Sequence, residues 1–124
     1  KFIDTVVNAD FIFPIRHYDI PSLMAGKLHA VMFRKYNKGR DYYDLFWYLA
    51  PQTQPNLKLL ENSIFQTERK RVPLDDDKWI ELLRAKLSKV DYRKIRRDVE
   101  PFIIDSKEVD LINEKQFAKL LARY

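Results

Sequence analysis

The chain has 124 residues, of which 46% are hydrophobic and none is cysteine, so it can bury one modest core but forms neither disulfides nor thiolate metal sites. Lysine and arginine outnumber aspartate and glutamate by 23 to 18. The net charge of +5 suits a nucleotide or nucleic-acid partner as well as it suits a solvated helical surface. The lack of cysteine favours a reducing, cytoplasmic location. No apolar run approaches the ~20 residues of a membrane span, so no membrane partner is expected.

Residues 1–19 are predicted to contain one or two short β-strands. Their apolar, β-rich runs are interrupted by the turn residues Asn8–Asp10 and end at Pro14. Because two short strands are not stable alone in water, we expect them to form the edge of a sheet whose other strands are missing here. The chain begins with Lys1 rather than methionine, which is consistent with the removal of preceding residues.

Residues 20–124 have a helical periodicity and are predicted to form a separate helical domain. Only two glycines occur in the chain, and Pro21 suits the first turn of a helix. The helix that begins there is apolar almost all round, so we expect it to be central and buried. It should end near Lys35, before a turn that contains Gly39.

The later elements are also predicted to be helices, each marked by a capping residue or a proline. The fold class is therefore mainly α (α+β overall), a bundle of about five or six helices with one or two short N-terminal strands. We expect a second helix from Arg40 or Asp41 to Pro51, a shorter one capped by Asn56, one started by Asp75–Asp77, one capped by Asp91 with Phe102 on its apolar face and Pro101 at its end, and a final one introduced by Asp105 and Glu108.

Charged residues border the apolar face of the first helix and open the second. Lys27 and Arg34 fall on one strip of the first helix, where a lysine either reaches water along its stem or holds an anion. Asp41 and Asp44 share a helix face, and Arg40 can pair with Asp44 one turn away. Each of these residues also has a purely structural interpretation, as a solvated charge or a helix cap. The two histidines are isolated, and a zinc site is not expected.

The joint pattern is more specific than its parts. The stretch IPSLMAGKLHAVMFRKYNKGRDYYDLFWYL resembles the C-terminal signature of AbiEii/AbiGii-type nucleotidyltransferase toxins, in which an A-x-K-L-x-A helix precedes K-G-R-D-x-x-D-L. Lys27 stands at the motif lysine, and Arg40, Asp41 and Asp44 stand at R-D-x-x-D. Two further motifs resemble those of the family as well, PN-x-x-x-L at 55–60 and D-V-x-P-F at 98–102.

The resemblance implies a nucleotidyltransferase-like fold and the toxin of a type IV toxin–antitoxin or abortive-infection pair. Such an enzyme transfers a nucleotide from a nucleoside triphosphate with Mg²⁺, has tRNA as an acceptor in some members, and has a cognate antitoxin as its partner. On this resemblance Lys27 would hold the triphosphate, with Arg34 and Arg40 as further nucleotide-binding cations. Asp41 would orient Lys27 or assist the acceptor hydroxyl, and Arg40 and Asp44 would form a supporting ion pair.

The chain departs from the family in lacking the Gly-Ser/Thr element and the metal-binding Asp-x-Asp pair of the other half. Its D-x-D, Asp75–Asp77, is interpreted as a helix cap. We therefore expect Mg²⁺ in the complete enzyme, no metal in this chain alone, and no activity without the missing half, to whose core residues 1–19 would belong.

Two alternatives remain open at this point. The chain could be a non-catalytic helical module that binds an antitoxin, or RNA through the basic residues between Arg69 and Arg97. It could also be a purely structural domain, which predicts that Lys27 and Asp41 lie far apart or in unrelated pairs.

Overall fold

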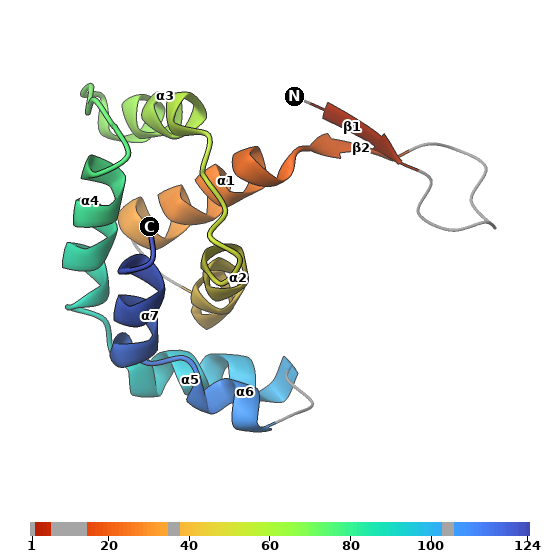
Figure 1. Ribbon diagram of the computed structural model, residues 1–124, viewed down its shortest axis with the longest axis vertical. Helices are drawn as coiled ribbons and strands as arrows, with labels where there is room; N and C mark the ends of the chain where they lie inside the picture. The colour runs from red at the N-terminus through yellow and green to blue at the C-terminus, as the bar shows by residue number, and fades with distance from the viewer. Residues whose placement is uncertain (1, 6–14, 35–37, 103–105) are drawn as a thin grey trace.

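Helices form most of the protein in the computed structural model, which describes residues 2–5, 15–34, 38–102 and 106–124 (Figure 1). The prediction of a mainly α fold is confirmed. Two strands, β1 (Phe2–Thr5) and β2 (Ile15–Tyr18), pair antiparallel with Phe2 opposite Tyr18, and β2 leads directly into the first helix. Within the described residues, every helix is too short or too polar to cross a bilayer.

Helix α1 (Ile20–Phe33) is the centre of the bundle. Asp19 caps it by accepting a hydrogen bond from the Ser22 amide at 3.1 Å, and a proline occupies the first turn as predicted. Its buried residues include Met24, Leu28 and Val31, because the helix contacts α2, α3 and α4. Figure 1 shows α1 running between α3 on one side and α2 on the other.

Helix α2 (Gly39–Leu49) packs on α1, α5 and α7 through the buried side chains of Tyr42, Leu45 and Leu49. Its first residue lies close to α5. A Cβ on Gly39 would stand 2.6 Å from the Ile95 carbonyl oxygen, so glycine is needed for this approach.

The next three helices begin where their caps predict. Asn56 caps α3 (Leu57–Glu68), Asp91 caps α5 (Tyr92–Val99), and the Asp75 carboxylate accepts from the amides of Asp77 and Lys78 before α4 (Lys78–Leu87). After α5 the chain forms a single 3₁₀ turn (Glu100–Phe102) at Pro101, as expected for a residue without an N–H.

Two predictions about the C-terminal part were wrong. Phe102 is 70% exposed instead of buried, because the chain has left the α-helical path of α5 before it reaches this residue. The single final helix is two helices, α6 (Ser106–Asp110) and α7 (Glu114–Leu121), and Asn113 caps the second by accepting from the Gln116 amide. Asp105, proposed as a cap, lies outside the described residues.

The core joins the C-terminal helix to the rest of the bundle. The ring of Phe117 meets Phe46 edge to face at 5.9 Å, and Trp79 meets Tyr124 in the same way at 5.0 Å. The Tyr124 hydroxyl donates to the Thr53 carbonyl at 2.6 Å, so the end of the chain is held against the loop before α3.

Candidate functional site

Four charged side chains meet where the second half of α1 lies beside the first half of α2. The Lys27 ammonium lies 3.2 Å from Asp41 Oδ1 and 2.9 Å from Asp44 Oδ2. The Arg34 guanidinium lies 3.2 Å from the other Asp41 oxygen, Oδ2. The structure therefore brings together four of the five residues that the sequence nominates, and the interpretation that required Lys27 and Asp41 to lie apart is wrong.

Asp41 is the buried member of this cluster. Its side chain is 9% exposed, whereas that of Lys27 is 31% exposed. A buried carboxylate is stable only when it is paired and hydrogen-bonded, and here each oxygen has its own cation. Asp41 is thus held in one orientation from both sides, and it holds Lys27 in turn.

The cluster keeps Lys27 charged. Partial burial is the largest single influence and lowers the pKa of the ammonium, but the hydrogen bonds and negative charges of Asp44 and Asp41 together outweigh it. The pKa of Lys27 is therefore raised above its usual value, and the side chain is a permanent cation at neutral pH.

Arg40 is the nominated residue that stays outside the cluster. It is exposed at the start of α2 and makes no ion pair with any described residue. The predicted Arg40–Asp44 pair is therefore wrong, since Asp44 pairs with Lys27 from the neighbouring helix. An exposed ion pair one helical turn apart contributes little to stability. Asp44 pairs instead with Lys27, which the packing of α1 on α2 brings close.

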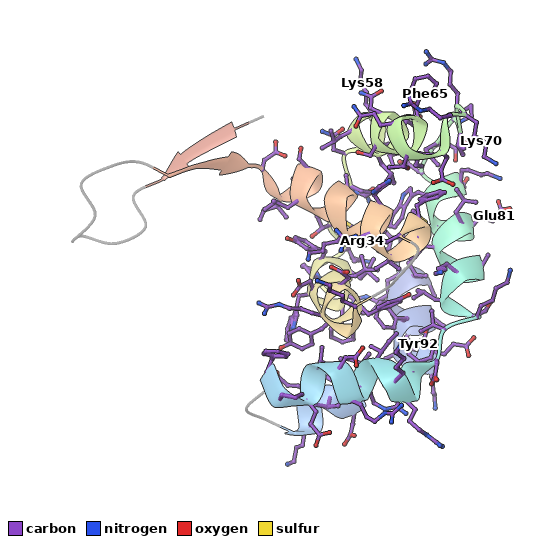
Figure 2. All side chains as sticks on the ribbon, turned by 180° about the vertical axis from the view of Figure 1, so that it is seen from behind. Arg34, Lys58, Phe65, Lys70, Glu81 and Tyr92 are labelled. Carbon is purple, nitrogen blue, oxygen red and sulfur yellow. The ribbon has the colours of Figure 1, made fainter. Side chains whose placement is uncertain are left out.

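A second correction concerns Arg34. The sequence places it within the first helix, but that helix ends at Phe33 and Arg34 has an extended backbone with ψ of 135°. Figure 2 shows Arg34 near the middle of the molecule, at the end of α1. The change of backbone direction does not remove it from the site, because its long side chain still reaches Asp41.

The cluster forms one wall of a groove of about 380 Å³ between α1, α2 and α3. The opposite side comes from α3 and was not predicted, because no local pattern tells which helix will face Lys27. The N-terminal strands are not among its described walls. The groove is lined by Ser22, Leu23, Gly26, Lys27, Ala30, Arg34, Asp41, Leu59 and Ser63.

Tyr48 is a further neighbour that the sequence analysis missed. Burial raises the pKa of its hydroxyl, while the charge of Lys27 lowers it and that of Asp44 raises it. These influences put Tyr48 within electrostatic reach of the cluster. Its position one turn after Asp44 on the same helix was the available signal.

Gly26 also lines the groove, and the packing of the helices does not explain why a glycine occupies this position. Glycine inside a helix costs about 1 kcal/mol relative to alanine. A Cβ at Gly26 would meet nothing within 4 Å, so the bundle has room for a larger residue. The fold therefore does not require glycine at this position, and the missing side chain leaves open space beside the helix.

The cluster does not fit a Mg²⁺ ion. Both oxygens of Asp41 and one of Asp44 are already engaged by cations, and the Lys27 ammonium occupies the place between the two carboxylates. Among the described residues no three His, Cys, Asp or Glu side chains come together elsewhere. Asp75, the first residue of the D-x-D motif, instead accepts hydrogen bonds from two backbone amides at the start of α4.

His29 lies on α1 but belongs to the packing of this helix. Its Nε2 is 3.0 Å from the Thr67 hydroxyl, and its ring stacks on Phe33 with centroids 5.8 Å apart. Burial and the charge of Arg34 lower its pKa, which favours the neutral imidazole.

The comparison with known protein families matches nearly the whole chain. A family described as the nucleotidyl transferase AbiEii toxin of a type IV toxin–antitoxin system matches residues 3–123. No curated protein and no solved structure gives a significant match. The match includes all four residues of the charged cluster. The chain therefore belongs to the AbiEii family of nucleotidyl transferase toxins.

Proposed function

We propose that this chain carries the triphosphate-binding wall of a nucleotidyltransferase toxin, in which Lys27 holds the phosphates of a nucleoside triphosphate. The observation that supports this most is the Lys27 ammonium on the wall of an open groove, held by Asp41 and Asp44. Arg34 supplies a second positive charge beside it. Two fixed cations at a groove edge suit a polyphosphate, whose charge they offset without reorganisation.

The role of the Lys27 cation follows from the bonds that form and break in nucleotidyl transfer. The acceptor hydroxyl oxygen bonds to the α-phosphorus, the bond to the bridging oxygen breaks, and pyrophosphate leaves with the bonding electrons. Negative charge therefore grows on the β- and γ-phosphates, where Lys27 stabilises it.

The two carboxylates would have different roles. Asp41 has a cation on each oxygen, so it positions Lys27 and Arg34 and has no free oxygen for a proton. Asp44 is more exposed, and its Oδ1 has no partner among the described residues. We assign Asp44 the acceptor hydroxyl proton, which its free oxygen accepts as the new bond forms.

Metal and acceptor are further parts of the proposal. Because the described carboxylates do not fit Mg²⁺, the residues that bind it would come from outside this chain, and the chain alone would be inactive. The acceptor would be an RNA such as tRNA, and a cognate antitoxin would bind the toxin, in keeping with the type IV family.

The test is nucleotide transfer by the protein expressed from its complete gene. With radiolabelled nucleoside triphosphates and total RNA, Lys27→Ala should lower the transfer rate by about 10²–10³-fold, the usual loss for a group that stabilises transition-state charge. Lys58→Ala is the matched control, because Lys58 is exposed on the outer side of α3, away from Arg34 (Figure 2). A folded Lys27→Ala protein with wild-type activity would contradict the proposal.

A second candidate function is RNA binding through α5. Arg93, Arg96 and Arg97 line a hollow of about 320 Å³ together with Glu100 and Asp110, and Arg93 and Arg97 are exposed. Arg96 is already committed to the Ile112 carbonyl at 2.9 Å. This candidate predicts RNA binding that survives Lys27→Ala together with no nucleotide transfer by the wild type, which separates it from the leading proposal.

A further inference from the structure

The lining of the groove beside Lys27 has two chemically different parts. Lys27 and Arg34, which both pair with Asp41, supply the cations of one part (the cationic part), whereas Leu23, Ala30 and Leu59 form an apolar part. Polyphosphate alone would require only the cationic part. The apolar part favours a ligand that has a flat or hydrophobic portion attached to its phosphates.

Gly26 lies in the apolar part, on the same face of α1 as Leu23 and Ala30. These positions are three and four residues from it, which is the spacing of one helix face. Because a Cβ at Gly26 would meet no atom within 4 Å, the space above it is open to the groove. Opposite it on α3 stand Leu59 and Ser63, also one turn apart.

The hydroxyl groups along the groove leave acceptor positions for a polar ligand edge. Ser63 donates its hydroxyl to the Leu59 carbonyl at 3.0 Å, which leaves its oxygen able to accept a hydrogen bond. The other serine, Ser22, accepts from the side-chain amide of Asn56 at 3.1 Å and is thereby fixed between α1 and the start of α3.

We infer that the nucleoside portion of the triphosphate lies in this groove against the Gly26 face of α1, with Leu59 and Ser63 on its other side. The inference rests on the proposed function of Lys27. A volume of about 380 Å³ is within the range of small-molecule sites, and the lining combines apolar contact with a few polar groups. Gly26 is thus a specificity-determining position that keeps space for the sugar or base.

The experiment measures binding of two kinds of probe to the protein from its complete gene, by calorimetry in buffer containing Mg²⁺. Inorganic tripolyphosphate reports the cationic part alone, and ATP, GTP, CTP and UTP report the cationic and apolar parts together. In the wild type at least one of the four nucleotides should bind about tenfold more tightly than tripolyphosphate, because it gains the apolar contact.

Gly26→Leu should remove that difference. Its Cβ has free space, and the longer side chain would extend into the groove, so nucleotide affinity should fall about tenfold while tripolyphosphate affinity changes less than about twofold. Ala85→Leu, at an exposed position on α4 outside the groove, is the matched control and should change neither.

Two outcomes overturn the inference: a wild type that binds none of the four nucleotides more tightly than tripolyphosphate, and a Gly26→Leu protein that keeps the wild-type difference. Failure of the proposed function itself is seen separately, as tripolyphosphate binding that Lys27→Ala does not weaken. Circular dichroism of each variant verifies that the bundle is folded.

Discussion

The two glycines of this chain stand in adjoining helices and serve opposite purposes. At Gly39 a Cβ would stand 2.6 Å from the Ile95 carbonyl oxygen and 2.7 Å from Asp98 Cβ, so the contact between α2 and α5 requires glycine. At Gly26 a Cβ would meet nothing within 4 Å. The first glycine closes the bundle, whereas the second leaves a surface open beside Lys27. A glycine in a helix therefore has a meaning only once its surroundings are known.

The region around Gly39 also determines where the site is. Asp41 follows two residues later, so the close approach of α2 to α5 helps to set the position of its carboxylate. Gly26 itself contributes nothing to this support, since a Cβ there would meet no atom within 4 Å. The stability of the protein should therefore depend strongly on the first glycine, moderately on the charged cluster and only slightly, with opposite sign, on the second.

The largest effect is expected for Gly39→Ala. The added methyl group must displace the backbone of α5, and overpacking of this kind costs about 1–3 kcal/mol of unfolding free energy. Urea denaturation followed by circular dichroism measures the change. A loss below about 0.5 kcal/mol, the usual range for surface substitutions, would mean that α2 and α5 are not in close contact.

An intermediate effect is expected for Lys27→Met, which keeps the length of the side chain but removes its charge. Asp41 then has Arg34 as its remaining cation, and the unfolding free energy should fall by about 1–2 kcal/mol at pH 7. Asp41→Asn in the same background should cost less than it does in the wild type, because the two residues stabilise each other. Additive losses would contradict the pairing.

The same pair predicts how stability depends on alkaline pH. Because the folded-state pKa of Lys27 is raised, its contribution is fully present below the pKa of the unfolded chain and is lost as pH rises through the folded-state value. Burial also raises the pKa of Tyr124 to about 12, so its neutral form contributes in the same direction and the same range. Stability should therefore fall above pH ~10, less steeply in Lys27→Met and in Tyr124→Phe than in the wild type.

The smallest effect, and the one with opposite sign, is expected for Gly26→Ala. Alanine has a higher helix propensity and its methyl group has free space, so the unfolding free energy should rise by about 0.5–1 kcal/mol. The melting temperature of the variant beside that of Gly39→Ala tests the comparison directly. Equal losses at both glycines would remove the distinction between the closed and open regions.

Much of the fold was predictable because it depends on neighbours in the sequence. Asn56 and Asp91 cap helices through amides three residues away, and Pro101 ends α5 by lacking an N–H. Local periodicity also explains the wrong prediction for Phe102. Its buried position was inferred by continuing the helical face of α5 past the residue at which that helix ends. The division into residues 1–19 and 20–124 remains a prediction.

The amino-acid sequence by itself determined most of the helical elements, the family and the nomination of Lys27, Arg34, Asp41 and Asp44. Only the tertiary structure decided that Asp44 pairs with Lys27 and not with Arg40, and that Leu59 and Ser63 face the groove. Helix propensity, capping and periodicity act within one or two turns of the chain, so they can be read in order. Ion pairs and grooves join residues from different helices, and their geometry exists only after the helices have packed.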